Sequence, residues 1–127
     1  MSKTFTLGKK KRLSSRKAIE QLFEKGRRFT LLPFRVLYLP SSENGLRVGV
    51  TAGSKTFPSA TDRNRIKRLS REAWRLQKNE LEQKLSAHQK GLDVFLVFAG
   101  KTKPDYSEVK MAVGQILEKL EKRIEKE

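Results

Sequence analysis

The residues best suited to chemistry in this sequence are the basic side chains of residues 63–78. This segment holds seven lysines and arginines and a single acid, Glu72. Projected at about 100° per residue, most of the basic residues share one side of a helix, with Asn64 among them and Glu72 at the margin. Ile66 and Leu69 fall on the opposite, apolar side. The pattern predicts a helix that docks on its own protein and binds a polyanion.

A charged helix can also be a solvated surface, and the chain contains such a helix for comparison. The polar side of residues 108–127 carries charges of alternating sign, which is typical of a solvent-facing helix. Residues 63–78 do not alternate. The net charge is +15, and residues 1–78 supply all of the excess, with 20 basic and 5 acidic residues against nine of each in residues 79–127. The basic half is therefore expected to bind an anionic partner.

Length and composition predict one domain over residues 1–127, in which residues 1–13 form a basic lead-in. The sequence has no cysteine, which excludes disulfides and thiolate metal sites and agrees with a cytoplasmic protein. The longest apolar run, residues 94–99, is far shorter than the roughly 20 residues that span a bilayer. We therefore expect a soluble protein with no membrane partner.

Hydrophobic periodicity predicts the element order α-β-β-α-β-α. We expect helices at 15–25 after a Ser14 or Ser15 cap, from Ser59 through the basic segment, and over 109–124, with strands at 29–39, 46–52 and 92–99. The second strand should return antiparallel through an Asn-Gly turn. The third, apolar on both faces, should lie centrally in the sheet. This order predicts a two-layer α/β sandwich of the α+β class, with helices packed on a small mixed sheet.

Residues arranged for protein catalysis are not evident in the sequence. His88 is the only histidine and lies in a polar stretch without a placed partner. Glu80 and Glu82 are two residues apart, so a helix would point them in different directions. No glycine-rich phosphate loop or zinc spacing appears. If the chain serves an enzyme, another component must perform the chemistry.

The run Arg-Asn-Arg-Ile-Lys-Arg at 63–68, followed by Arg71-Glu72, resembles the signature of the protein subunit of bacterial ribonuclease P. The resemblance covers nearly the whole chain. It includes Leu13 with Phe23 and Gly26, Arg47-Val48-Gly49, and Ser54-Lys55.

This resemblance implies a fold with a left-handed β-α-β crossover, as in the second domain of a small-subunit ribosomal protein. It also implies a ribonucleoprotein endoribonuclease, a hydrolase whose catalytic RNA subunit removes the 5′ leader of precursor tRNA. Mg²⁺ would be required and held mainly by RNA. The protein would supply no catalytic residue and no metal ligand, and would broaden the range of substrates.

The resemblance also assigns binding roles by matching position. The residues expected to bind the RNA subunit are Arg63, Asn64, Arg65, Lys67, Arg68 and Arg71, with Arg75 on the same face and Lys55 and Arg12 beside them. The residues expected to bind the leader are Phe23, Ile19 and Tyr38, since aromatic faces stack on bases without strong sequence preference.

Two of these side chains, and Trp74 beside them on the basic helix, have alternative roles. The projection turns Arg65 away from the cationic side, so it could hold the helix to its own fold through Glu72 or a backbone carbonyl. Phe23 could be core, and Trp74 could either stack on RNA or cover the final helix.

Two other functions share the same charge and fold class. A ribosomal protein or an RNA chaperone would bind RNA through a similar helix without serving a catalytic partner. A helix in a DNA major groove is disfavoured because neither a zipper nor a helix-turn-helix partner accompanies it, and no DNA partner is expected.

Overall fold

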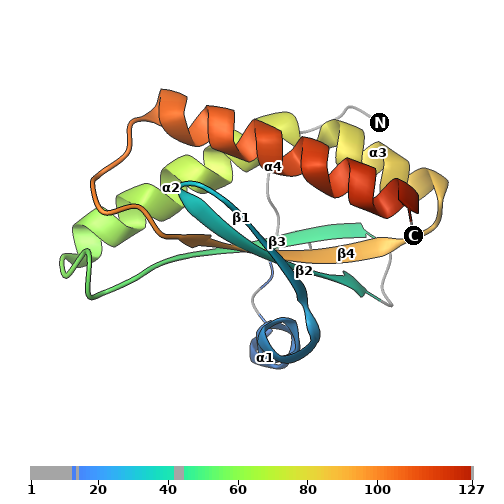
Figure 1. The fold of residues 1–127 in the computed structure, drawn as a ribbon, viewed down its shortest axis with the longest axis horizontal. Helices are drawn as coiled ribbons and strands as arrows, with labels where there is room; N and C mark the ends of the chain where they lie inside the picture. The colour runs from blue at the N-terminus through green and yellow to red at the C-terminus, as the bar shows by residue number, and fades with distance from the viewer. Residues whose placement is uncertain (1–12, 14, 42–44, 127) are drawn as a thin grey trace.

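The computed structural model describes residues 13, 15–41 and 45–126. The elements follow in the order α1 (Arg16–Lys25), β1 (Arg27–Leu31), β2 (Phe34–Ser41), β3 (Gly45–Ala52), α2 (Ala60–Gln77), α3 (Asn79–Ala87), β4 (Gly91–Phe98) and α4 (Tyr106–Lys126). The strands form one sheet in the order β1-β2-β4-β3. Helices α2, α3 and α4 lie on one side of this sheet, and α1 lies on the other (Figure 1). The predicted α/β class with a small mixed sheet is confirmed.

The predicted strand at 29–39 is wrong, because the structure divides it into β1 and β2. The two strands form an antiparallel hairpin in which Leu31 pairs with Phe34. Leu32 and the cis-bonded Pro33 make the turn. Apolar residues run through this turn without interruption, so the hydrophobic pattern did not show the break. Pro33 was its only local signal.

Helix α3 was also missed, since no element was expected between the basic helix and the strand at 92–99. Only Leu81 and Leu85 of this helix are buried, one helical turn apart. Two apolar residues among polar ones are too weak a periodicity to predict a helix.

The sheet places β4 between the two strands that were expected to be neighbours. β3 does run antiparallel to β2, but it pairs with β4 in parallel, and β4 pairs with β2 in the antiparallel sense. Helices α2 and α3 make the long connection that a parallel pair requires. The left-handedness implied by the resemblance stays a prediction.

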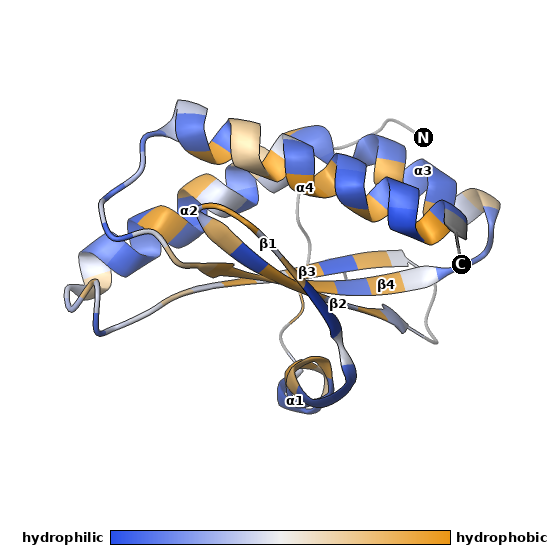
Figure 2. Cartoon of the chain, viewed as in Figure 1, coloured by the Kyte–Doolittle hydropathy of each residue, from blue (hydrophilic) through white to orange (hydrophobic). Residues whose placement is uncertain are grey.

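The central position predicted for the third strand is confirmed. β4 contributes Leu92, Val94, Leu96 and Phe98 to the main core beneath α2, α3 and α4. Its residue Phe95 instead joins Leu13, Leu22 and Leu37 in a smaller core beneath α1. Helix α4 turns its hydrophobic side toward the sheet (Figure 2). Its predicted stripe is buried and comprises Val109, Val113, Ile116, Leu117, Leu120 and Ile124.

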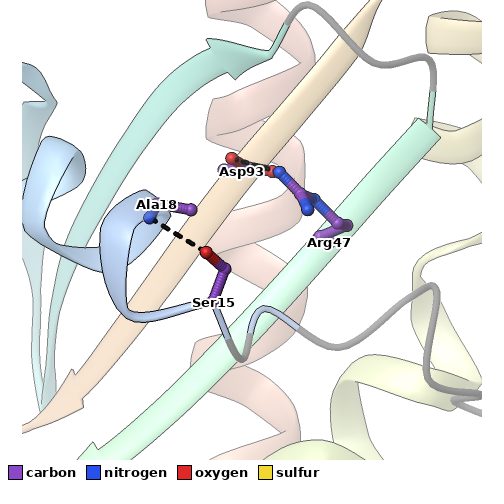
Figure 3. A network of polar contacts seen from close by, with 4 residues as sticks. All are labelled: Ser15, Ala18, Arg47 and Asp93. Carbon is purple, nitrogen blue, oxygen red and sulfur yellow. Dashed lines mark hydrogen bonds and ion pairs between the residues drawn. The ribbon is translucent and has the colours of Figure 1, made fainter.

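An ion pair joins β3 to β4 on the face that carries α1. Nε and Nη2 of Arg47 donate to the two carboxylate oxygens of Asp93, at 2.8 and 2.9 Å. The side chain of Asp93 is only 9% exposed. Nearby, the Ser15 hydroxyl accepts a hydrogen bond from the backbone N–H of Ala18 and caps α1, as predicted (Figure 3). The charge of Asp93 inside an otherwise apolar strand was the sequence signal for this pair.

Replacing Arg47 with Ala should lower the free energy of unfolding by about 2 to 3 kcal/mol, because it leaves the buried Asp93 carboxylate without its partner. Arg16→Ala is the matched control, since Arg16 is 94% exposed and its ion pair with Glu20 lies in solvent. Urea denaturation of both variants provides the measurement. Equal stability of the two variants would contradict the role assigned to the pair.

Candidate nucleic-acid interfaces

The first turn of α2 is held by its own side chains and by the loop before it. The Ser59 hydroxyl accepts from the backbone N–H of Asp62 at 3.5 Å, as the predicted cap requires. Nη1 of Arg63 donates to the carbonyls of Phe57 and Pro58 at 2.7 and 2.8 Å. Arg63 therefore fixes the loop against the helix, in addition to any contact it makes with RNA.

The buried side of α2 determines which side chains face outward. Ile66, Ala73 and Trp74 are buried against the sheet and α4. The Ser70 hydroxyl donates to the carbonyl of Ile66 and is satisfied within the helix. Trp74 is only 1% exposed, so its role is core packing and not RNA stacking.

The predicted RNA-binding residues remain accessible once α2 is packed. Asn64, Arg65 and Arg68 are exposed, and Arg63, Lys67, Arg71 and Arg75 are half-buried. Lys55 is exposed in the loop between β3 and α2. Arg12 lies outside the described residues. We call the described members of this set, namely Lys55, Arg63, Asn64, Arg65, Lys67, Arg68, Arg71 and Arg75, the basic face.

The acid within residues 63–78, Glu72, is paired with a member of the basic face itself. Arg75 donates to the Glu72 carboxylate one turn away on α2. The alternative that Arg65 is held by Glu72 is therefore wrong, and Arg65 points into solvent. Part of the charge of Arg75 is neutralised at this end of the helix.

The basic face does not extend to Lys78, the last basic residue of the 63–78 segment. Lys78 is 1% exposed and donates to the carboxylate of Glu82 at 2.8 Å. The projection treated residues 63–78 as one continuous helix, but α2 ends at Gln77 and Lys78 is the junction with α3.

A second basic segment, missed by the sequence interpretation, lies beside the start of α2. Lys103, in the loop between β4 and α4, forms an ion pair with Asp62 at 3.2 Å and remains 59% exposed. Lys101 in the same loop is exposed. Only the topology of the sheet brings this loop to α2, so no local sequence pattern could have indicated the contact.

The α1 side of the sheet presents an exposed aromatic ring. Phe23 is 44% exposed, and its ring meets Phe95 edge to face with centroids 5.6 Å apart. Ile19 is half-buried against the core beneath α1. Gly49 pairs with Phe95 on the neighbouring strand, and packing explains why this position is a glycine: a Cβ there would lie 2.7 Å from the Phe95 ring. Phe23 is thus supported from below and open above, as a base-stacking residue requires.

Tyr38 does not lie on this side. It is 2% exposed and faces the main core, where its hydroxyl accepts from Nη1 of Arg123 at 2.9 Å and its ring contacts Phe29. Side chains alternate along β2, so the residues of this strand on the α1 side are Arg35, Leu37 and Leu39, of which Leu37 and Leu39 pack in the core beneath α1. The alternation was visible in the sequence, but the resemblance alone did not say which set faces α1.

The resolved pKa shifts lie away from both surfaces, between α3 and α4. A hydrogen bond with Glu125 raises the pKa of Lys84 and lowers the pKa of the Glu125 carboxyl. Burial raises the pKa of Glu121. Within the described part of the chain, no group of three or more His, Cys, Asp or Glu side chains could hold a metal ion, and no helix could cross a membrane.

Comparison with known proteins identifies the family. The family model for Ribonuclease P matches residues 7–121. The chain belongs to the ribonuclease P protein family. The ribonuclease P protein component of Porphyromonas gingivalis is 35% identical over 117 residues, covering 90% of this chain and 85% of the relative. That of Syntrophus aciditrophicus is 33% identical over 129 residues, covering 98% and 99%.

Solved structures of ribonuclease P proteins share this fold. The protein from Thermotoga maritima superposes with a TM-score of 0.68 at 25% identity, covering 85% of this chain and 96% of its own. The protein from Staphylococcus aureus gives a TM-score of 0.62 at 18% identity, covering 85% and 93%. Membership of the ribonuclease P family implies a tRNA-processing ribonuclease complex with an RNA partner.

If the basic face makes about five phosphate contacts, the slope of log affinity against log salt for RNA should be about −4 to −5. Arg68→Ala should flatten this slope by about one, because one phosphate contact is lost. Lys122→Ala removes the same charge from the exposed side of α4 and should leave the slope unchanged. Filter-binding titrations across a salt series measure both. Similar slopes for the two variants would mean that the basic face is misassigned.

Proposed function

We propose that this protein is the accessory protein subunit of ribonuclease P, in which the basic face binds the catalytic RNA subunit and the α1 side of the sheet binds the single-stranded 5′ leader of precursor tRNA. The observation that carries the proposal is the placement of the Arg-Asn-Arg-Ile-Lys-Arg run. Its Asn64, Arg65 and Arg68 side chains are exposed on a helix whose other side is core, in a chain of this family.

The composition of the basic face suits contact with a folded RNA backbone. Arginine dominates the set, and its planar guanidinium can donate two parallel hydrogen bonds to a phosphate. The face is presented by an 18-residue helix whose buried side is fixed, so its charges keep a constant spacing. Such an arrangement favours a partner with a defined surface over a flexible strand.

The α1 side of the sheet suits a single strand instead. The exposed ring of Phe23 can stack on an unpaired base, and stacking tolerates every base because each has a π-face. Leaders differ in sequence between tRNAs, so tolerant stacking would let one subunit serve many precursors and would broaden the substrate range. Ile19, the other predicted leader-binding residue of α1, lies half-buried one helical turn before Phe23.

Cleavage is assigned to the RNA subunit. Hydrolysis of a phosphodiester by protein side chains needs an acid–base pair or carboxylates that hold metal ions, and the described residues place no such set on either RNA-facing surface. Mg²⁺ would therefore be held mainly by RNA. The reaction is that of an endoribonuclease acting on tRNA precursors, which we place in the cytoplasm.

A ribosomal protein or an RNA chaperone remains the second candidate, since either would carry a similar basic helix. The distinction is whether a ribozyme gains activity. We expect the protein to stimulate correct 5′ cleavage of a precursor tRNA at low Mg²⁺ by the ribonuclease P RNA of the same organism. A protein-only reaction is the control and should show no cleavage. Tight RNA binding without stimulation would assign the protein to the second class.

A further inference from the structure

Helix α1 covers only part of the sheet face on which it lies. The strand register aligns one row of residues across all four strands, namely Thr30, Arg35, Val97 and Thr51. The neighbouring row contains Leu37 and Phe95, which pack beneath α1. At roughly 4.8 Å between strands, the first row extends about 14 Å across the sheet. Its β3 end leads directly into the loop that carries Lys55.

A cavity of 330 Å³ lies along the β1 and β2 half of this row. Its walls include the apolar side chains of Phe23, Leu37 and Val97 and the polar side chains of Arg28, Thr30 and Arg35. None of the residues that line it is acidic. This volume is at the small end of the range for ligand sites, which suits one nucleotide and not a duplex.

The two arginines of the cavity have different roles. Arg28 donates through Nη2 to the carbonyl of Phe23, so it fastens the last turn of α1 and holds Phe23 in place. Arg35 is exposed on β2, and no ion pair joins it to an acid within the part of the chain that the structure describes. It is therefore the cation at this site best placed to meet an anionic ligand.

We propose that Arg35 determines how strongly the enzyme recognises long leaders, by binding a phosphate of the nucleotide whose base stacks on Phe23. The row of residues gives the single-stranded RNA leader a path across the sheet. The path runs from Thr51, beside the loop that leads to the basic face, toward Arg35 at the β1–β2 side. Nucleotides close to the cleavage site would lie at the Thr51 end, and Arg35 would hold those farther upstream. This inference rests on the proposed function and adds to it a residue that sets leader-length preference.

The test uses the reconstituted holoenzyme and two precursor tRNAs that differ only in leader length, one with a single-nucleotide leader and one with a long leader. Arg35→Ala should weaken binding of the long-leader precursor about five- to tenfold, because a charge-assisted contact is lost. Binding of the single-nucleotide precursor and affinity for the RNA subunit should not change. The salt slope should fall by about one for the long leader alone. Arg35→Lys should retain part of the preference, since it keeps the charge but not the planar fork.

Arg16→Ala is the matched control, because it removes an exposed arginine from the other end of α1 and should leave both precursors unaffected. If Arg35→Ala lowers the melting temperature, Arg35→Gln, which keeps a long polar side chain on the strand, replaces it. Equal losses for both leader lengths, or no loss for the long leader, would overturn the proposal. Absence of any leader preference in the wild-type enzyme would instead refute leader binding itself, so the two failures can be told apart.

Discussion

The architecture depends on the burial of β4 on both of its faces. One set of alternate side chains packs beneath α2, α3 and α4, and Phe95 packs beneath α1. Both faces of this strand must be covered, so the chain has to cross over one face with α2 and lay α1 on the other. The basic face on α2 and the ring of Phe23 on α1 therefore lie on opposite sides of the same sheet. One sheet, with a core on each face, thus supports two surfaces suited to different forms of RNA.

The basic face stays cationic because the acidic side chains near it are already paired with other basic side chains or with Arg75 at the end of the helix. Near α2, the carboxylates of Asp62, Glu72 and Glu82 each pair with a base, namely Lys103, Arg75 and Lys78 respectively. These pairs position the loop after β4, the end of α2 and the junction with α3. The remaining excess, +15 over the chain, acts at long range and favours association with a polyanion. Local pairs therefore serve the fold, while the net charge serves binding.

Sequence reasoning predicted best where periodicity was long. The basic helix, the doubly apolar strand and the C-terminal helix each show a pattern that one local conformation satisfies. It was wrong where one residue interrupts a continuous pattern, as at Pro33, and where a helix was projected past its end, as at Lys78. Tyr38 was placed on the wrong face because a strand has two faces and only the position of α1 distinguishes them. The roles of Asp93 and Arg35 depend on strand register, which joins residues far apart in the chain.

The central claim is that two separate surfaces perform two separate tasks. The most direct measurement compares holoenzymes carrying Arg68→Ala or Phe23→Ala, recording in one titration series the affinity for the RNA subunit and the ratio of affinities for precursors with and without a leader. The account predicts that Arg68→Ala weakens assembly and leaves the leader ratio intact, whereas Phe23→Ala lowers the leader ratio and leaves assembly intact. If each variant changed both quantities to the same extent, a single RNA-binding surface would explain the data and the division would be wrong.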